Sequence, residues 1–213
     1  RPSPAGPPLA DFNGDRVRDF ALWLPEGAGD SDHGPLRLNV LDGRTGRPLW
    51  ATATMTVHHP DRLICPEPAV ADLDGDGVAE VLVNRHGGFH QHTLSYHCEL
   101  VAVDGRDGRP RWTWEWQAGF PQMWSPVVFR PDASGPPMIG LVVVVTNDAP
   151  TLVALDVNGG EKLRRRLHLP GQHLEYGRHV WRAADVDGDG REELVYLDDG
   201  RLCVAGGERL EVR

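Results

Sequence analysis

The chain has 213 residues, 40% of them hydrophobic and 25% charged, and a formal net charge of −9. These values are typical of a soluble globular protein with a substantial core, and the negative charge argues against nucleic acid or an anionic membrane surface as a partner. The longest apolar run, residues 139–145, is far shorter than the ~20 residues that span a bilayer, so we expect no membrane insertion of this segment. Because the sequence has neither an initiator methionine nor a signal peptide, we expect it to be a segment of a longer protein.

An acidic turn recurs along the chain. It reads ADFNGDRVRDFAL from Ala10, ADLDGDGVAEVLV from Ala71 and ADVDGDGREELVY from Ala184. The first gap between copies is 61 residues and the second is 113, about two units of similar length. We therefore expect a degenerate copy midway through the second gap, and residues 127–145 have its strand–turn–strand outline without the acids.

A second pattern follows each acidic turn. An alternating run, a glycine-bearing turn and another run occupy residues 38–50, 100–112 and 152–164, and a shortened copy occupies 202–212. This pattern is typical of a β-hairpin. Each unit thus reads as four strands, which in unit two we expect at 68–72, 79–84, 99–104 and 111–116.

Repeating units of ~40–60 residues with four short antiparallel strands are typical of β-propeller blades. The expected fold class is all-β, with a single propeller or propeller segment over residues 1–213. Its four blades are expected at approximately 7–56, 66–117, 125–168 and 180–213. The segment either closes on itself as a four-bladed ring or forms part of a larger ring of seven or eight blades.

The acidic turn places oxygen ligands at alternate positions, which suits calcium. Ca²⁺ takes six to eight oxygens from carboxylates and backbone carbonyls. We expect the side chains at positions 1, 3, 5 and 9 of the turn, and the carbonyl at position 7, to bind one ion. The expected ligands are Asp72, Asp74, Asp76, the Val78 carbonyl and Glu80 in unit two; Asp185, Asp187, Asp189, the Arg191 carbonyl and Glu193 in unit four; and Asp11, Asn13, Asp15, the Val17 carbonyl and Asp19 in unit one.

Units two and four are the two principal expected calcium sites. Unit one is a weaker third, because Asn13 replaces an acid and Arg16 replaces a glycine. An EF-hand is excluded, because position 12 holds Leu22, Val83 and Tyr196 rather than an acid. The alternative is that the Asp-Gly pairs only make good hairpin turns. However, two carboxylates ~5 Å apart repel by roughly 3 kcal/mol at an effective dielectric near 20, so we expect the turn to open without a cation.

The acidic turns resemble FG-GAP/VCBS-type repeats, the calcium-loop blades also found in the integrin alpha-chain propeller. The hairpins LDGRTGRPLW and VDGRDGRPRW are similar to the outer strands of quinoprotein-like (PQQ-type) propeller repeats. Unit three departs from the calcium pattern. The resemblance implies an extracellular, periplasmic or cell-surface location and a recognition, adhesion or scaffold role, and it implies no single activity.

The ten histidines are expected on the face of the blades opposite the acidic turns, because all of them fall in or beside connections at that end. Loops held by a rigid scaffold often carry binding sites, so we expect a protein or glycan ligand on this face. Its candidate contacts are His58, His59, His90, His92, Tyr96, His97, Trp124, His173 and Tyr176. The alternatives are that polar residues simply gather in loops, or that His90, His92 and His97 bind a transition metal.

We expect a non-catalytic, calcium-binding propeller that acts as an extracellular recognition, adhesion or scaffold module. The alternative is an enzyme, either a propeller-type polysaccharide lyase or hydrolase or a quinoprotein-like domain. A lyase commonly uses Lys, Arg or His as a base in a groove, whereas the single lysine, Lys162, falls on an expected outer strand. The histidine-rich loops keep the enzyme alternative open.

Two further residue patterns concern packing and redox state. Trp112, Trp114 and Trp116 alternate, so we expect them to share one strand face and to pack between blades rather than form an exposed adhesive patch. Of the three cysteines, Cys65 and Cys98 are the pair to test for a disulfide.

Overall fold

The computed structural model describes residues 9–25, 36–52, 67–86, 98–117, 121–132, 134–145, 148–167, 181–198, 201–206 and 211–212. Within these ranges every regular element is a β-strand, as the sequence predicts. No helical segment in the described part of the chain has the length and apolarity needed to cross a bilayer.

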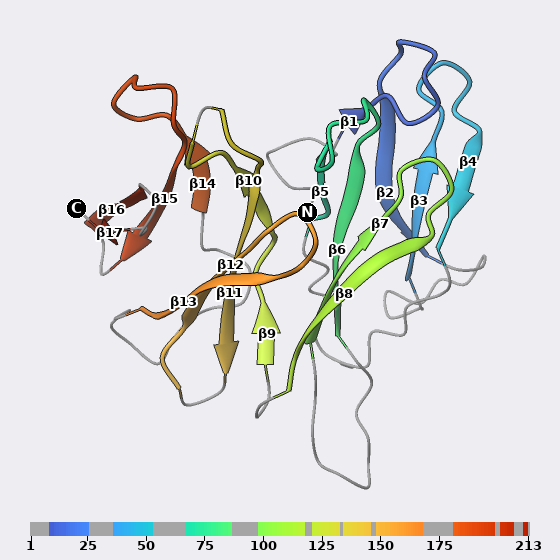
Figure 1. The fold of residues 1–213 in the computed structure, drawn as a ribbon. Helices are drawn as coiled ribbons and strands as arrows, with labels where there is room; N and C mark the ends of the chain where they lie inside the picture. Colours follow the sequence, from blue (N-terminus) through green and yellow to red (C-terminus); the bar gives the residue numbers. More distant parts are fainter. Residues whose placement is uncertain are drawn as a thin grey trace, which may run out of the picture.

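The strands form four separate antiparallel sheets in chain order, which we call blades one to four (Figure 1). Blade one contains β1 (Leu9–Ala10), β2 (Asp19–Pro25), β3 (Leu36–Leu41) and β4 (Pro48–Ala51), and blade two contains β5 (Ala69–Ala71), β6 (Glu80–His86), β7 (Cys98–Val103) and β8 (Pro110–Trp116). Blade three contains β10 (Val127–Phe129), β11 (Met138–Val145), β12 (Thr151–Leu155) and β13 (Glu161–Arg166), and blade four contains β14 (Trp181–Ala184), β15 (Glu193–Asp198), β16 (Arg201–Gly206) and β17 (Glu211–Val212).

The four-stranded plan of each unit is confirmed, and the strands of blade two lie within two residues of their expected bounds. Blade three differs by one strand. β9 (Pro121–Met123) pairs with the far end of β11 and makes this sheet five-stranded. β9 was not expected from the sequence, because three residues are too few for an alternating pattern to be recognised.

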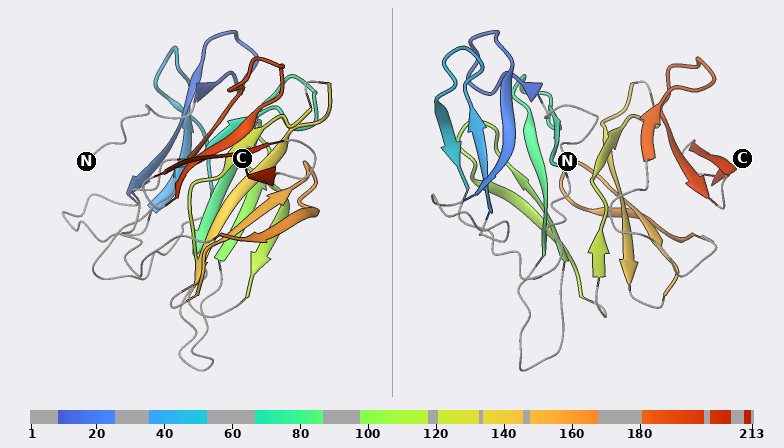
Figure 2. Two further views of the ribbon diagram at one scale, coloured as in Figure 1. Left: turned by 90° about the vertical axis from the view of Figure 1, so that its left-hand side faces the viewer. Right: turned by 180° about the vertical axis from the view of Figure 1, so that it is seen from behind.

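The blades stand side by side in a row. Their first strands contact one another in chain order, β1 with β5, β5 with β10, and β10 with β14. Figures 1 and 2 show blades one and four at opposite ends of this row, with blades two and three between them. The arrangement is that of consecutive propeller blades, and the described residues do not close it into a ring.

The hydrophobic core consists of three clusters, each between two consecutive blades. The cluster between blades two and three, for example, joins Leu82 and Leu100 to Leu141 and Val153, all fully or almost fully buried. Corresponding clusters lie between blades one and two and between blades three and four. The inner strands of blades two and three are apolar on both faces because each of these blades has a neighbouring blade on two sides, and this is why β7 and β11 read as nearly continuous apolar runs.

The tryptophans of the outer strands pack between blades, as predicted. Trp112, Trp114 and Trp116 of β8 lie against the cluster shared with blade three. The Trp112 Nε1 also donates a 2.8 Å hydrogen bond to the Val157 carbonyl of blade three, and the Trp50 Nε1 of blade one donates a 2.6 Å bond to the Gly105 carbonyl of blade two. Each indole therefore fastens its blade to a turn of the next one.

Candidate metal centre

The acidic turn joins the first two strands of a blade, and its shape is set by hydrogen bonds to the aspartate at position 1. In blade two, Asp72 accepts the backbone N–H groups of Gly75 at 2.8 Å and Gly77 at 3.0 Å. These glycines have φ values of 79° and 88°, a backbone region in which residues with a Cβ are strained. The turn of blade four repeats the arrangement around Asp185, with N–H donors from its own two glycines at 2.7 and 2.9 Å.

The acid at position 9 is held by the backbone N–H of position 2, the residue that follows the aspartate at position 1. Glu80 begins β6, is 1% exposed, and accepts the backbone N–H of Leu73 at 2.9 Å. Glu193 begins β15, is 7% exposed, and accepts the N–H of Val186 at 3.0 Å. One oxygen of each carboxylate is thus bound to the backbone, and this bond fixes the direction of the other oxygen.

Positions 1, 3 and 9 converge in two of the three expected turns. In blade two, one carboxylate oxygen from each of Asp72, Asp74 and Glu80 lies within 4.8 Å of the other two. In blade four, the same holds for Asp185, Asp187 and Glu193. Three converging anionic oxygens with no sulfur or nitrogen donor suit a hard divalent cation such as Ca²⁺ rather than a soft metal. These residues could hold a metal ion.

The expected ligands at positions 5 and 7 are not members of these groups. Asp76 and Asp189 each accept the backbone N–H two residues further on, at 2.9 and 2.8 Å. That bond belongs to the turn itself, and their part in binding a metal remains a prediction. The same is true of the Val78 and Arg191 carbonyls, for which the described contacts give no test.

The turn of blade one is built differently. Asp19 is fully buried, and its two oxygens accept the N–H groups of Phe12 and Gly43, both at 2.8 Å. This carboxylate therefore ties the acidic turn to the β3–β4 turn of its own blade. Arg16, with φ 66°, occupies the backbone position that glycine has in blades two and four. Asp11, Asn13, Asp15, the Val17 carbonyl and Asp19 remain a predicted third site, and blade one adds no group of three convergent acids among the described residues.

Arginines from the outer hairpin of blade two contact the acidic turn. The Arg111 guanidinium pairs with Glu80 through Nη1 and with Asp74 through Nη2, the latter at 2.6 Å. Arg106 lies 2.9 Å from the Asp76 carboxylate. In blade two, two guanidinium groups and several backbone N–H groups offset part of the repulsion between the carboxylates, which weakens the argument that this turn must open without a cation.

Burial and the arginine charges shift the pKa values of the acids in opposite directions. Burial raises the pKa of Glu80 above its ordinary value, although the Leu73 N–H and the Arg111 guanidinium act against this. The pKa of Asp76 is lowered, first by the Val78 N–H and then by Arg106. The pKa of Arg111 is raised, chiefly by its hydrogen bond to Asp74, so its positive charge is secure.

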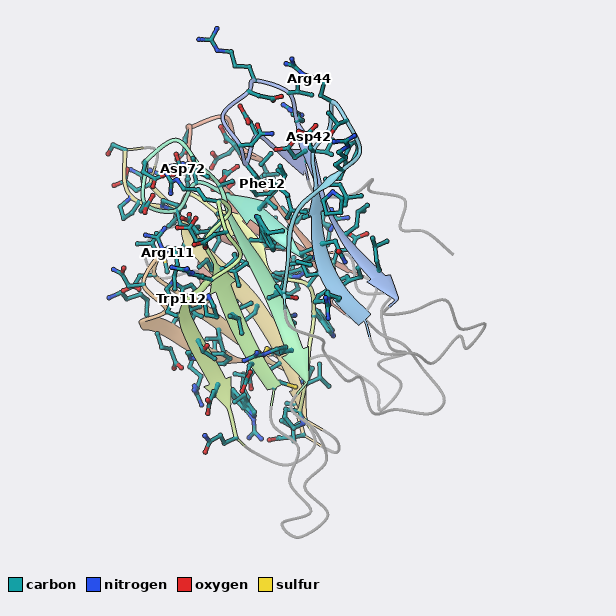
Figure 3. All side chains as sticks on the ribbon, turned by 90° about the vertical axis from the view of Figure 1, so that its right-hand side faces the viewer. Phe12, Asp42, Arg44, Asp72, Arg111 and Trp112 are labelled. Carbon is teal, nitrogen blue, oxygen red and sulfur yellow. The ribbon has the colours of Figure 1, made fainter. Side chains whose placement is uncertain are left out.

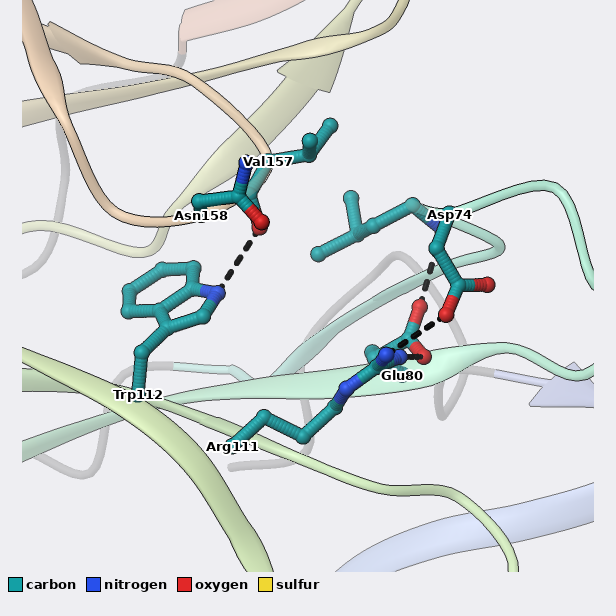
Figure 4. A pocket seen from close by; sticks show the side chains of 7 residues that line it. Asp74, Glu80, Arg111, Trp112, Val157 and Asn158 are labelled. Atoms are coloured by element: carbon teal, nitrogen blue, oxygen red, sulfur yellow. Dashed lines mark hydrogen bonds and ion pairs between the residues drawn. The ribbon is translucent and has the colours of Figure 1, made fainter.

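A pocket of about 40 Å³ lies beside this cluster, at the junction of blades two and three. Figure 4 shows Asp74, Glu80 and Arg111 on one side of it and Trp112, Val157 and Asn158 on the other. A volume of this size holds a water molecule or a small ion. The blade-two cluster is therefore accessible to small species.

The acidic turns and the hairpin turns lie at the same end of the blades, as strand direction predicts. The Asn13 Nδ2 donates to Asp42 across 3.3 Å in blade one, and Arg44 lies 3.3 Å from Asp15. Figure 3 shows Asp42, Arg44 and Asp72 together at this end. The arginine contacts to these turns were missed at the sequence level, and the signal for them was the arginine that follows Asp-Gly in both hairpins.

Most of the predicted ligand face lies outside the described residues. This holds for His58, His59, His90, His92, Tyr96, His97, His173 and Tyr176. Trp124 is described, is half-buried, and packs against the cluster between blades three and four, while its carbonyl accepts the Asn84 Nδ2 at 2.5 Å. The Cys98 thiol donates to the Pro121 carbonyl at 2.8 Å, and Cys65 lies outside the described residues, so the disulfide remains a prediction.

Comparisons with known proteins identify the fold and no family. No protein-family model and no curated protein matches the sequence. Two β-propeller proteins are among the solved structures that resemble this one. Rhamnogalacturonan lyase YesW has a TM-score of 0.61 at 17% identity over 91% of this chain and 40% of its own length. Quinohemoprotein alcohol dehydrogenase from Comamonas testosteroni has a TM-score of 0.50 at 15% identity over 92% of this chain and 33% of its own length. The chain thus spans less than half the length of these proteins.

Proposed function

We propose that this chain is a calcium-stabilised set of propeller blades that serves, without catalysis, as a recognition, adhesion or scaffold module outside the cell, in the periplasm or at the cell surface. Its turns are proposed to be FG-GAP/VCBS-type repeats. The observation that carries the proposal is the convergence of positions 1, 3 and 9 in the turns of blades two and four. In both turns, backbone N–H groups orient the three carboxylates.

The bound ion would act on stability. Position 1 lies after the first strand and position 9 begins the second, so one cation held by both fastens the two strands together. A ligand present at 100 times its dissociation constant stabilises the folded state by about 2.7 kcal/mol. For a domain of this size, that corresponds to a rise in melting temperature of roughly 5–10 °C per fully occupied site.

Thermal melts in calcium and in chelator test the calcium part. We expect the wild-type midpoint to rise in calcium and the rise to shrink in Asp187→Asn, which removes one of the three converging charges in blade four. Asp132→Asn is the matched control, because Asp132 is an exposed acid in the corresponding turn of blade three and belongs to no convergent group. Equal melting midpoints of the wild-type protein in calcium and in chelator would refute calcium binding. If the calcium-induced rise shrank equally in Asp187→Asn and Asp132→Asn, the result would argue against a calcium site in blade four.

The recognition part places a protein or glycan ligand on the face opposite the acidic turns. The support is the histidine and aromatic content of the connections at that end together with a rigid scaffold of four blades. A glycan-array screen in calcium is the direct measurement, with the chelated protein as its control. Absence of binding in calcium to any glycan would leave a protein ligand or a scaffold role.

A second candidate is a polysaccharide lyase domain, favoured by the fold likeness to rhamnogalacturonan lyase YesW. Incubation of the protein with rhamnogalacturonan, followed by ultraviolet absorbance of the unsaturated product, separates the two functions. Product formation would overturn the non-catalytic proposal, whereas binding without product supports it.

A further inference from the structure

The acidic turns of blades two and four have the same backbone hydrogen bonds but different charged neighbours. In blade two, Arg111 reaches both Glu80 and Asp74. These are two of the three acids whose carboxylates converge, so a guanidinium already contacts two of the groups proposed to bind calcium (Figure 4). Figure 4 also shows that Arg111 lies on the opposite side of the pocket from the Trp112 indole.

The position of Arg111 depends on a β-bulge. Along β7 and β8, Ala102 is opposite Trp112 and Val103 is opposite Pro110, so Arg111 is an extra residue without a cross-strand partner. A bulge of this kind turns the side chain of the extra residue away from the ordinary strand alternation. The bulge therefore directs Arg111 toward the acidic turn, while Trp112 keeps its place against blade three.

The residue at the bulge position differs in the other blades. In blade one the extra residue is Leu49, which has no charge. In blade three it is Lys162, which pairs at 2.9 Å with Asp156 of its own hairpin. In blade four the described pairs of β16 with β17, Ala205 with Val212 and Gly206 with Glu211, include no extra residue to compare.

We infer that Arg111 is a built-in counter-ion that holds the acidic turn of blade two closed without metal and competes with calcium for Glu80 and Asp74. This inference rests on the proposed calcium binding for its second half only. Glu80 is almost fully buried, so a cation must accompany its charge, and Arg111 and a divalent ion offer two exclusive ways to provide one. The blade-two turn therefore binds calcium only when Arg111 swings out.

The test compares Arg111→Leu with Arg109→Leu. Leucine is the residue that blade one has at this position, so the backbone accepts it. Arg109 belongs to the same hairpin turn, is 85% exposed and pairs with Asp107 rather than with the acidic turn. Both substitutions remove one positive charge, and only the first removes contacts to Glu80 and Asp74.

Both variants are studied in the Asp187→Asn background. This substitution weakens the blade-four site, so that calcium binding to blade two can be measured. Calcium binding is measured by calorimetric titration, and melts in chelator measure the metal-free fold. We expect Arg111→Leu to bind calcium at least about tenfold more tightly than Arg109→Leu, and to melt at a lower temperature without metal. Equal affinities would overturn the competition.

The two proposals fail in distinguishable ways. If neither the wild-type protein nor any variant binds calcium, the proposed function is wrong. The melts in chelator then still decide the counter-ion role, because they contain no metal. A metal-free Arg111→Leu protein that is as stable as Arg109→Leu would overturn that role.

Discussion

The contact between an indole and a glycine turn makes a quantitative prediction about blade packing. Gly108 lies in the β7–β8 turn with φ 72°, and a Cβ added there would lie 2.5 Å from the Trp50 Cε3 of blade one. We expect Gly108→Ala to cost about 1 kcal/mol for the left-handed backbone and a further 1–3 kcal/mol for displacing the ring. The total predicted loss in the free energy of unfolding is roughly 2–4 kcal/mol.

Gly46 provides the matched control. It occupies the same place in the β3–β4 turn, has φ 67°, and donates the same type of hydrogen bond to the first residue of the turn. No atom lies within 4 Å of a Cβ built at Gly46, so Gly46→Ala bears the backbone cost alone, about 1 kcal/mol. Urea unfolding followed by tryptophan fluorescence gives both values. Equal losses in the two variants would refute the argument that the indole contact joins the blades.

Three further outcomes are expected. Trp112→Phe should lower the free energy of unfolding by about 1–2 kcal/mol in urea titrations, because it leaves the buried side of the Val157 carbonyl without its N–H donor; an unchanged midpoint would contradict this. Asp19→Asn should lower the melting temperature in calcium and in chelator alike, because one of the two backbone N–H groups bound to Asp19 loses its acceptor oxygen. A lower melting temperature in calcium only would instead indicate that Asp19 is a metal ligand. Burial raises the pKa of Cys98 to about 12; because the unfolded chain releases this proton at lower pH, stability should fall as pH rises above about 9, and Cys98→Ala should weaken that dependence.

Much of the fold follows from local sequence patterns. Alternating apolar residues and glycine-bearing turns are short-range signals, and they gave the four-stranded units, the degenerate third unit and the strand bounds of blade two. The acids at positions 1, 3 and 9 could also be assigned from spacing, because a turn of nine residues brings its own side chains together whatever surrounds it. In blades two and four the structure brings these three acids together, and their binding of a metal remains a prediction.

Which charges meet between elements could not be read from the sequence. Glu80 and Arg111 are 31 residues apart, and their contact requires the register of β7 with β8 and the bulge that isolates Arg111. The same holds for the bonds of Asp19, a predicted ninth-position ligand whose carboxylate bridges two turns of blade one. Local spacing determined the blades and their acidic turns, whereas the pairing of distant strands decided that Arg111 meets the blade-two turn, because a side chain's reach is short and only folding brings its partner within it.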